Sequence, residues 1–260
     1  MASPEARIQA LVLKKAKLGE ADLILHLMAQ DGAAVHAVAK GARKPKNASS
    51  ATLDVLNTVE VTIVSGKSLD IAKGSRLIEH HGTLLSDPAR FACASVIAEV
   101  AEATIQRDLP APKLFDMTRT ALAAIAEAPE PTLPLMMAGF AFKLTALMGM
   151  RPSFAFCACC SAPLLEQGTC SRFSYADGGA VCLACASSTD TVGVTSDVLA
   201  LCHVLFRSTF AEIARMGEVG LAWEVASLSK IWLARQTGSR VRSFSAFKSI
   251  CGCMEGASVI

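Results

Sequence analysis

The segment Val59-Glu60-Val61-Thr62-Ile63-Val64 alternates apolar and polar side chains, and its odd-numbered residues are Val, Val and Ile. Because successive residues of a β-strand point to opposite faces, this alternation predicts a strand with one buried side. The turn signal Ser65-Gly66-Lys67 follows, the apolar pattern resumes at Leu69, and Arg76–His80 can form a closing segment. We therefore expect paired β-strands in this part of the chain.

The residues before this segment show the same period of two. Strand patterns run over Arg7–Lys14, Asp22–Met28 and Ala33–Ala39, and Asp31-Gly32 is a hairpin turn signal between the second and third. Residues Asn47–Leu56 leave room for a helix. Five or six short strands in about 80 residues suit a small closed barrel such as an OB-fold.

The period changes to about 3.6 after Ser86-Asp87-Pro88, which predicts helices. Ser196 and Asp197 are expected to cap one of them. We expect an α+β protein: an OB-fold barrel over residues 1–82, then an all-α domain over residues 83–260 with an inserted element at about 153–190. The apolar stripes that predict these helices are Phe115, Leu122 and Ile125; Met136, Phe140, Leu144 and Leu147; Leu201, Leu205 and Phe210; and Leu221, Val225, Leu228 and Trp232.

Four cysteines define the inserted element: Cys157-x-x-Cys160 and Cys182-x-x-Cys185, separated by 21 residues. Each CxxC turn directs two thiolates at one point, and two turns supply the four ligands of a tetrahedral zinc site. The gap is slightly longer than the usual range of about 15 to 20 residues. Four thiolates leave no open coordination position, so we predict one structural zinc in a four-cysteine, zinc-ribbon-like element.

Other uses of these cysteines fit the sequence less well. A thioredoxin-like CxxC requires a βαβ setting, disulfides suit a secreted chain, and a zinc deaminase requires an H-x-E motif; none of these features accompanies the cysteines. Cys159 and Cys170 complicate the ligand assignment, but two residues must separate a ligand pair, which favours Cys157 with Cys160. Whether Cys159 or Cys170 replaces a ligand stays open.

Basic residues form two clusters, although the formal net charge is only +2. Between residues 14 and 46 there are seven Lys or Arg against three acids, and between residues 230 and 248 there are five and no acid. Both clusters are candidate phosphate-binding surfaces, and an ordinary solvated face is the alternative for each. The members of the first cluster are Lys14, Lys15, Lys17, Lys40, Arg43, Lys44 and Lys46.

No charge-free apolar run approaches the roughly 18 residues that a spanning helix requires, and no apolar leader segment is visible. We expect a cytoplasmic protein without a membrane partner. A Ser-His-Asp order, a Walker loop and a glycine-rich phosphate cradle are also absent, so we expect no enzymatic activity.

The ordered motifs resemble the RecO family of bacterial recombination mediators. The resemblance runs through Leu18–Ile24, the basic loop Val38–Lys46, Leu114-Phe115-Asp116, and Gly149-Met150-Arg151-Pro152 leading into the first cysteine pair. Gly178-Gly179-Ala180-Val181 then leads into the second pair. Ser161 departs from the pattern, because the family often has glycine after the fourth residue of the first CxxC.

The resemblance implies a nucleoid-associated protein that binds single- and double-stranded DNA, anneals strands coated with single-strand-binding protein, and helps RecR to load RecA. It also implies a site for the acidic, hydrophobic tail of single-strand-binding protein, for which we predict Trp232, Arg235, Arg240 and Arg242. Residues 1–80 contain no Phe, Tyr or Trp on which bases can stack. We therefore expect sequence-neutral binding to the DNA backbone.

Two alternative functions remain. One is a zinc-ribbon scaffold with incidental nucleic-acid affinity, and the other is a thiol oxidoreductase using Cys157 and Cys160.

Overall fold

A computed structural model describes residues 5–44, 49–66, 68–164 and 171–252. The chain divides by packing into two compact units, Met1–Ala126 and Glu127–Ile260. The predicted domains, 1–82 and 83–260, instead follow the change from strands to helices. The two divisions differ because α3 (Pro88–Thr104) packs against β1 and β2 of the barrel and so belongs to the first unit.

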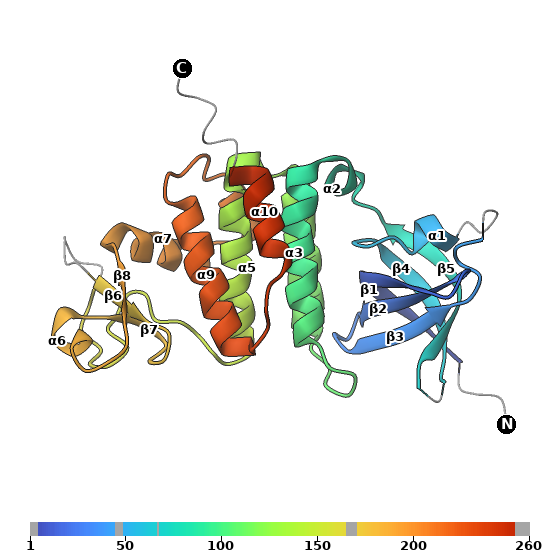
Figure 1. The fold of residues 1–260 in the computed structure, drawn as a ribbon, viewed down its shortest axis with the longest axis horizontal. Helices are drawn as coiled ribbons and strands as arrows, with labels where there is room; N and C mark the ends of the chain where they lie inside the picture. Colours follow the sequence, from blue (N-terminus) through green and yellow to red (C-terminus); the bar gives the residue numbers. More distant parts are fainter. Residues whose placement is uncertain (1–4, 45–48, 67, 165–170, 253–260) are drawn as a thin grey trace, which may run out of the picture. The chain divides into compact units, whose positions relative to one another are not determined.

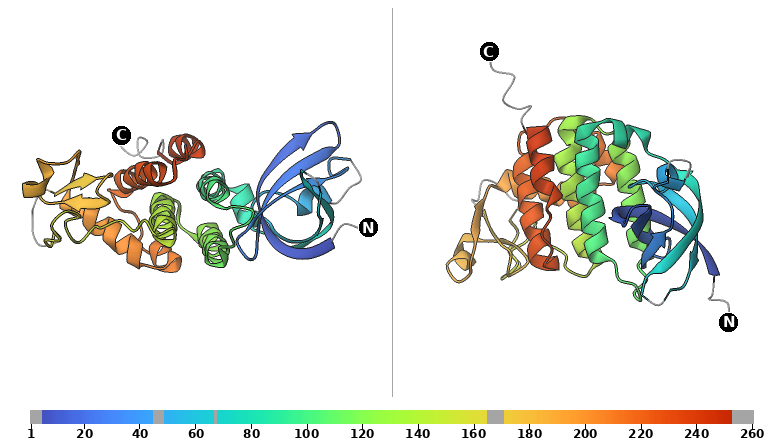
Figure 2. Two further views of the ribbon diagram at one scale, coloured as in Figure 1. Left: turned by 90° about the horizontal axis from the view of Figure 1, so that it is seen from below. Right: turned by 45° about the vertical axis from the view of Figure 1, so that its right-hand side comes forward.

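A closed five-stranded barrel occupies the first part of the chain (Figures 1 and 2). Its strand order is β1-β2-β3-β5-β4, and β1 closes the barrel by pairing with β4. All pairs are antiparallel except β3 with β5, which are parallel. The predicted OB-like barrel is therefore confirmed. The strands are β1 (Glu5–Leu18), β2 (Asp22–Ala29), β3 (Ala34–Ala39), β4 (Thr58–Val64) and β5 (Asp70–Glu79).

Three bulges, at Leu13 in β1 and at Gly74 and Ile78 in β5, change which side chains face the barrel interior. The first lies at Leu13, because Val12 pairs with Leu27 whereas Lys14 pairs with His26. The second lies at Gly74, whose φ of 61° is in the left-handed region. The strand pattern that resumes near Leu69 and most of the predicted closing segment Arg76–His80 belong to a single strand, β5, which continues through this bulge.

The barrel core consists of small and branched side chains, which suits the narrow interior of five strands. A short helix, α1 (Ser49–Thr52), occupies the predicted gap between β3 and β4, and Leu53 behind it joins the core. The other core residues are Ala10, Val12, Leu23, Leu25, Leu27, Ala37, Ala39, Ala42, Val59, Val61 and Ile63.

The helices of the first unit are α2 (Gly82–Ser86), α3 and α4 (Pro112–Glu127). Asp87 caps α3 by accepting hydrogen bonds from the backbone N–H groups of Ala89 and Arg90. The segment between α3 and α4 lies against the β2–β3 turn, where a Cβ on Gly32 would meet the carbonyl of Ala111 at 2.1 Å. The predicted stripe of Phe115, Leu122 and Ile125 is buried in α4.

The second unit contains a 3-10 turn, η1 (Glu130–Thr132), and a helical bundle around α5 (Leu133–Leu147), which packs side by side with α9 (Ala222–Thr237) (Figure 1). The remaining helices are α6 (Leu183–Ala186), α7 (Ser196–Arg207), α8 (Phe210–Ala214) and α10 (Ser243–Gly252). No helix among the described residues is long and apolar enough to cross a bilayer.

Two details of α7 differ from the sequence-based prediction. Thr195, rather than Ser196 or Asp197, caps the helix, because its side chain accepts the hydrogen bond from the Val198 N–H. The stripe that was to continue to Phe210 is interrupted after Arg207, since Thr209 and Glu212 form a capping box that starts α8.

A small three-stranded sheet is inserted between α5 and α7. Its order is β7-β6-β8, with β6 (Ser171–Ser174), β7 (Gly179–Val181) and β8 (Val192–Val194). Phe173 of β6 lies between Phe154, with ring centroids 6.2 Å apart, and Trp232 of α9, with centroids 6.0 Å apart. This aromatic contact fastens the sheet to the helices of the same unit.

Candidate functional site

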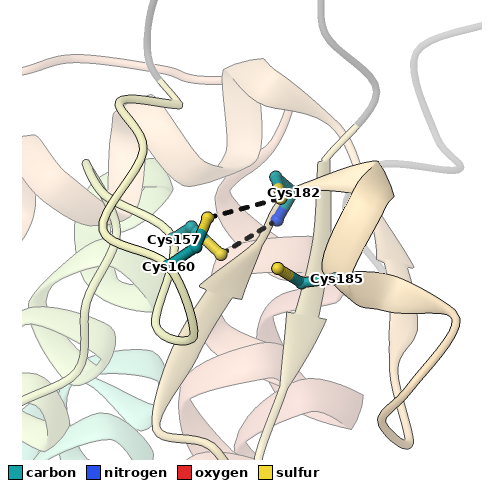
Figure 3. Close-up of side chains that lie close together, drawn as sticks. All are labelled: Cys157, Cys160, Cys182 and Cys185. Atoms are coloured by element: carbon teal, nitrogen blue, oxygen red, sulfur yellow. Dashed lines mark hydrogen bonds between the residues drawn. The ribbon is translucent and has the colours of Figure 1, made fainter.

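The four cysteines of the inserted element meet at one point (Figure 3). Cys157 and Cys160 lie on the loop before the small sheet, Cys182 follows β7, and Cys185 lies in α6. Their Sγ atoms all lie within 4.8 Å of one another, and the Sγ atoms of Cys160 and Cys182 are 3.7 Å apart. Sulfurs bound to one tetrahedral zinc lie about 3.8 Å apart, because each Zn–S bond is about 2.3 Å long. The cluster therefore fits a zinc-binding element.

The electrostatics of the cluster favour a cation. Burial raises the pKa of the Cys157 thiol, but hydrogen bonds from the backbone N–H groups of Cys182, Cys160 and Cys159 outweigh it and lower that pKa to about 6. Hydrogen bonds with the Cys182 and Cys160 side chains raise the pKa of Cys185 to about 12. The protein alone thus favours one thiolate and disfavours another, whereas a divalent cation stabilises a thiolate at every ligand.

Backbone hydrogen bonds fix the two cysteine turns. Cys157 accepts on its carbonyl from the Ser161 N–H at 2.9 Å, and the Ala158 N–H donates to the Ala180 carbonyl at 2.8 Å. Ser161 has a φ of 61°, a left-handed conformation that favours glycine. A glycine would adopt this conformation without strain. Cys159 points to solvent, and Cys170 lies outside the described residues.

The basic residues of the barrel gather partly at one end, where the β1–β2 hairpin meets the loop after β3. Lys17 pairs with Leu23, which in turn pairs with Ala39, the residue before Lys40. We call Lys17, Lys40, Arg43 and Lys44 the basic tip; all four are exposed. Lys46 lies outside the described residues.

Hydrogen bonds fix the loop that carries three residues of the basic tip, Lys40, Arg43 and Lys44. The Gly41 N–H donates to the Asp22 carboxylate at 2.7 Å, and the Arg43 N–H donates to the Ala21 carbonyl at 2.9 Å. The Arg43 guanidinium also donates to the Gly19 carbonyl at 3.1 Å. Within the described part of the chain, no carboxylate lies within 4.0 Å of a charged nitrogen of the basic tip.

Lys14 and Lys15 are placed differently. The bulge at Leu13 leaves Lys14 opposite His26 on the outer face of the barrel, where its ammonium lies 4.0 Å from the Glu102 carboxylate of α3. Lys15 faces the other side of β1 and forms an ion pair with Asp54. The structure therefore does not bring all the predicted lysines to one surface.

Family models match both parts of the chain. One, described as the N terminal of recombination protein O, matches residues 1–81, and another, described as its C terminal, matches residues 85–243. The chain belongs to the recombination protein O family. Proteins of the RecO family are non-enzymatic recombination mediators that bind DNA and act in its repair. Enzymatic thiol chemistry at Cys157 and Cys160 is therefore not its function.

The predicted partner site of this RecO-family chain needs a correction at Trp232. This side chain is only 1% exposed, and its indole N–H donates to the Thr145 hydroxyl at 2.9 Å, so it is a core residue. Tryptophan suits either a surface or a core, because its polar N–H can form a hydrogen bond in both places. The sequence therefore did not show on which side of the helix Trp232 lies. Arg235, Arg240 and Arg242 are exposed, as predicted for a surface.

A pocket of about 450 Å³ lies beside α9 and was not predicted. Arg235 lies one helical turn beyond Ile231, so the apolar lining continues into a basic end. Of the α9 residues that line the pocket, Glu224 lies at the opposite end from Ile231 and brings a carboxylate. The lining residues are Tyr175, Val192, Gly193, Val194, Thr195, Val198, Glu224, Leu228 and Ile231.

Proposed function

We propose that this RecO-family chain binds DNA through the basic tip and uses that contact to anneal complementary strands coated with single-strand-binding protein. The observation that supports this most directly is the basic tip itself: Lys40, Arg43 and Lys44 lie exposed on a loop held by hydrogen bonds, Lys17 lies exposed at the end of β1, and no described acid lies beside their charged nitrogens. Cations held in this way neutralise phosphates and release counterions, which gives affinity without sequence preference. Binding by the sugar-phosphate backbone leaves base edges available for pairing.

Lys14 and Lys15 contribute less in this proposal because each already has an acid partner. This difference gives the test. For single-stranded DNA, Lys44→Ala should lower the magnitude of the slope of log K against log salt concentration by about 0.7, the value for one phosphate contact. Lys15→Ala is the matched control and should leave the slope unchanged. Equal slopes for wild type and Lys44→Ala would remove Lys44 from the interface.

Family membership and the groove beside α9 support a partner role. We propose that the groove receives the acidic, hydrophobic tail of single-strand-binding protein, with apolar side chains over Leu228 and Ile231 and a carboxylate near Arg235. Through this contact the protein reaches coated strands and, with RecR, assists the loading of RecA.

Fluorescence polarisation with a labelled acidic tail peptide tests the groove. Arg235→Glu should weaken peptide binding at least ten-fold, since it reverses the charge one helical turn beyond Ile231 of the lining, whereas Arg215→Glu, which follows α8, should not. Wild-type affinity in Arg235→Glu contradicts the proposed site. An absence of any oligonucleotide binding by the wild-type protein would instead favour the scaffold alternative.

The cysteine cluster is proposed to hold one structural zinc. Its four ligands leave no position for a reacting molecule, so the metal would supply folding free energy to the inserted element.

A further inference from the structure

The barrel wall has an opening between β3 and β5. These strands pair over only three residues each, Ala37–Ala39 with Asp70–Ala72. Beyond this ladder β3 turns into the loop of the basic tip, and the Gly74 bulge bends β5. A pocket of about 450 Å³ lies there, which is within the roughly 300 to 1,000 Å³ of typical ligand sites.

The inner part of this pocket is lined by small and apolar side chains of the barrel core. Ala72 pairs with Ile63 and Ser75 pairs with Val61, and both partners face the barrel core, so Ala72 and Ser75 also point inward. Ala39, Ala42 and Leu53, which belong to the same core, complete the inner lining. The inner lining therefore suits a flat, largely apolar group.

One polar atom in this lining lacks a partner. The Ser75 hydroxyl is buried and has no hydrogen bond among the described residues. A buried hydroxyl without a partner costs free energy, about 1 to 3 kcal/mol by mutational data, and a native structure rarely retains one without a reason. A ligand with a polar edge inside the pocket would supply that partner.

Two cations flank the entrance. Lys40 and Lys73 directly follow the last paired residues, Ala39 and Ala72, and both are exposed members of the pocket lining. Like charges on neighbouring strands repel each other. Neither ammonium has an acid partner among the residues that the structure describes. An anion between them would remove this repulsion.

We propose that this pocket receives one nucleotide of an unpaired DNA strand, with its phosphate between Lys40 and Lys73 and its base inside, where the Ser75 hydroxyl meets the polar edge. This rests on the proposed DNA binding at the adjacent basic tip and adds a means of distinguishing single strands from duplexes. A paired base cannot turn inward without first breaking its pair. Because a hydroxyl can both donate and accept a hydrogen bond, the Ser75 contact does not by itself select one base.

Fluorescence of 2-aminopurine within a single-stranded oligonucleotide tests the proposal with the full-length protein. Binding should raise the fluorescence, because a base that enters the pocket leaves its stacked neighbours. Lys73→Ala should abolish most of the rise and lower the salt-slope magnitude by about 0.7 for single strands. The matched control is Arg76→Ala, on the same strand but outside the pocket lining, where the guanidinium pairs with Glu60.

Ser75→Ala provides a second variant that should fold, because it removes an unpartnered buried hydroxyl. Its urea midpoint should be no lower than that of the wild type, while the fluorescence rise should shrink. Oligonucleotide binding without any fluorescence change, or equal changes in Lys73→Ala and Arg76→Ala, overturns the pocket but leaves binding at the basic tip intact. Failure of the wild-type protein to bind any oligonucleotide overturns both proposals.

Discussion

The indole N–H of Trp232 donates a hydrogen bond to the hydroxyl of Thr145 at 2.9 Å, and both residues are buried. The bond joins α9 to α5, and the rings of Trp232 and Phe173 of the inserted sheet pack edge to face, with centroids 6.0 Å apart. One side chain thus connects the two longest helices of the second unit to the element that carries the cysteines. Its position in the core makes it a determinant of stability.

Replacing Thr145 by Val should lower the free energy of unfolding by about 1 to 3 kcal/mol, because the buried Trp232 N–H loses its acceptor while the side-chain volume is preserved. Urea denaturation measures the change. Thr120→Val serves as the control, since the Thr120 hydroxyl bonds only to the Asp116 carbonyl at an exposed site. Equal losses in the two variants would show that the hydrogen bond to Trp232 contributes nothing.

Lys143 should make stability depend on pH. Its ammonium donates to the carbonyls of Leu205 and Phe206 at 2.7 and 2.8 Å, and burial lowers its pKa from 10.5 to about 8. Between these two pH values the unfolded chain binds a proton that the folded chain does not, so stability should rise with pH across this window. Below pH 8 both states carry the proton, and the effect should level off.

Lys143→Met removes this titration and should flatten the rise. The readout is the difference in urea unfolding free energy between wild type and variant, followed from pH 7.5 to 10, because subtraction cancels the other titrating groups. A difference that stays constant over that range would contradict a lowered pKa at Lys143.

Metal removal should affect the second unit selectively. The purified wild type and Cys159→Ser should each contain one zinc per chain, whereas Cys185→Ser should contain much less, because Cys185 belongs to the four-sulfur cluster and Cys159 does not. A chelator should lower the thermal midpoint of the second unit, since a structural zinc contributes to folding. Salt-dependent DNA binding at the basic tip should persist. Normal zinc content in Cys185→Ser would rule out the proposed ligand set.

Ser161→Gly should stabilise the inserted element. A non-glycine residue in the left-handed region costs about 1 to 2 kcal/mol, and the greater freedom of glycine in the unfolded chain offsets part of this. The expected net gain is about 0.5 to 1 kcal/mol in urea denaturation of the metal-loaded protein. Ser153→Gly is the control, because the Ser153 hydroxyl donates to the Phe156 carbonyl at 2.7 Å and its loss should destabilise. A stability loss in Ser161→Gly would contradict strain at this turn.

Periodicity predicted the barrel well because its alternation is local. The segment Val59–Val64 coincides almost wholly with β4, and β2 and β3 differ from their predicted limits by one residue. Alternation cannot reveal a bulge, however, so the sequence did not show that β5 is one strand or which of Lys14 and Lys15 lies on the outer face of the barrel. One extra residue moves each later side chain of the strand to the opposite face of the sheet.

The residues at the entrance of the barrel pocket were harder to predict than the four cysteine ligands. The CxxC spacing gathers ligands by local geometry, whereas the entrance of the barrel pocket pairs Lys40 with Lys73, an isolated lysine 33 positions further along the chain. Only the parallel pairing of β3 with β5 makes them neighbours. Trp232 was misassigned for a related reason: an apolar stripe shows which face of a helix is covered, not what covers it.

The shortest ladder of the barrel joins β3 to β5 over three residue pairs, whereas β1 pairs with β4 over seven. Short parallel ladders between distant residues form late in folding and break early. Because Ala37–Ala39 also pair with β2, only the amide protons in the β3–β5 ladder, and not those bonded to β2, should be among the first of the barrel to exchange with deuterated solvent. Transient opening of this ladder would admit a DNA strand while the other four strand pairs of the barrel stay intact.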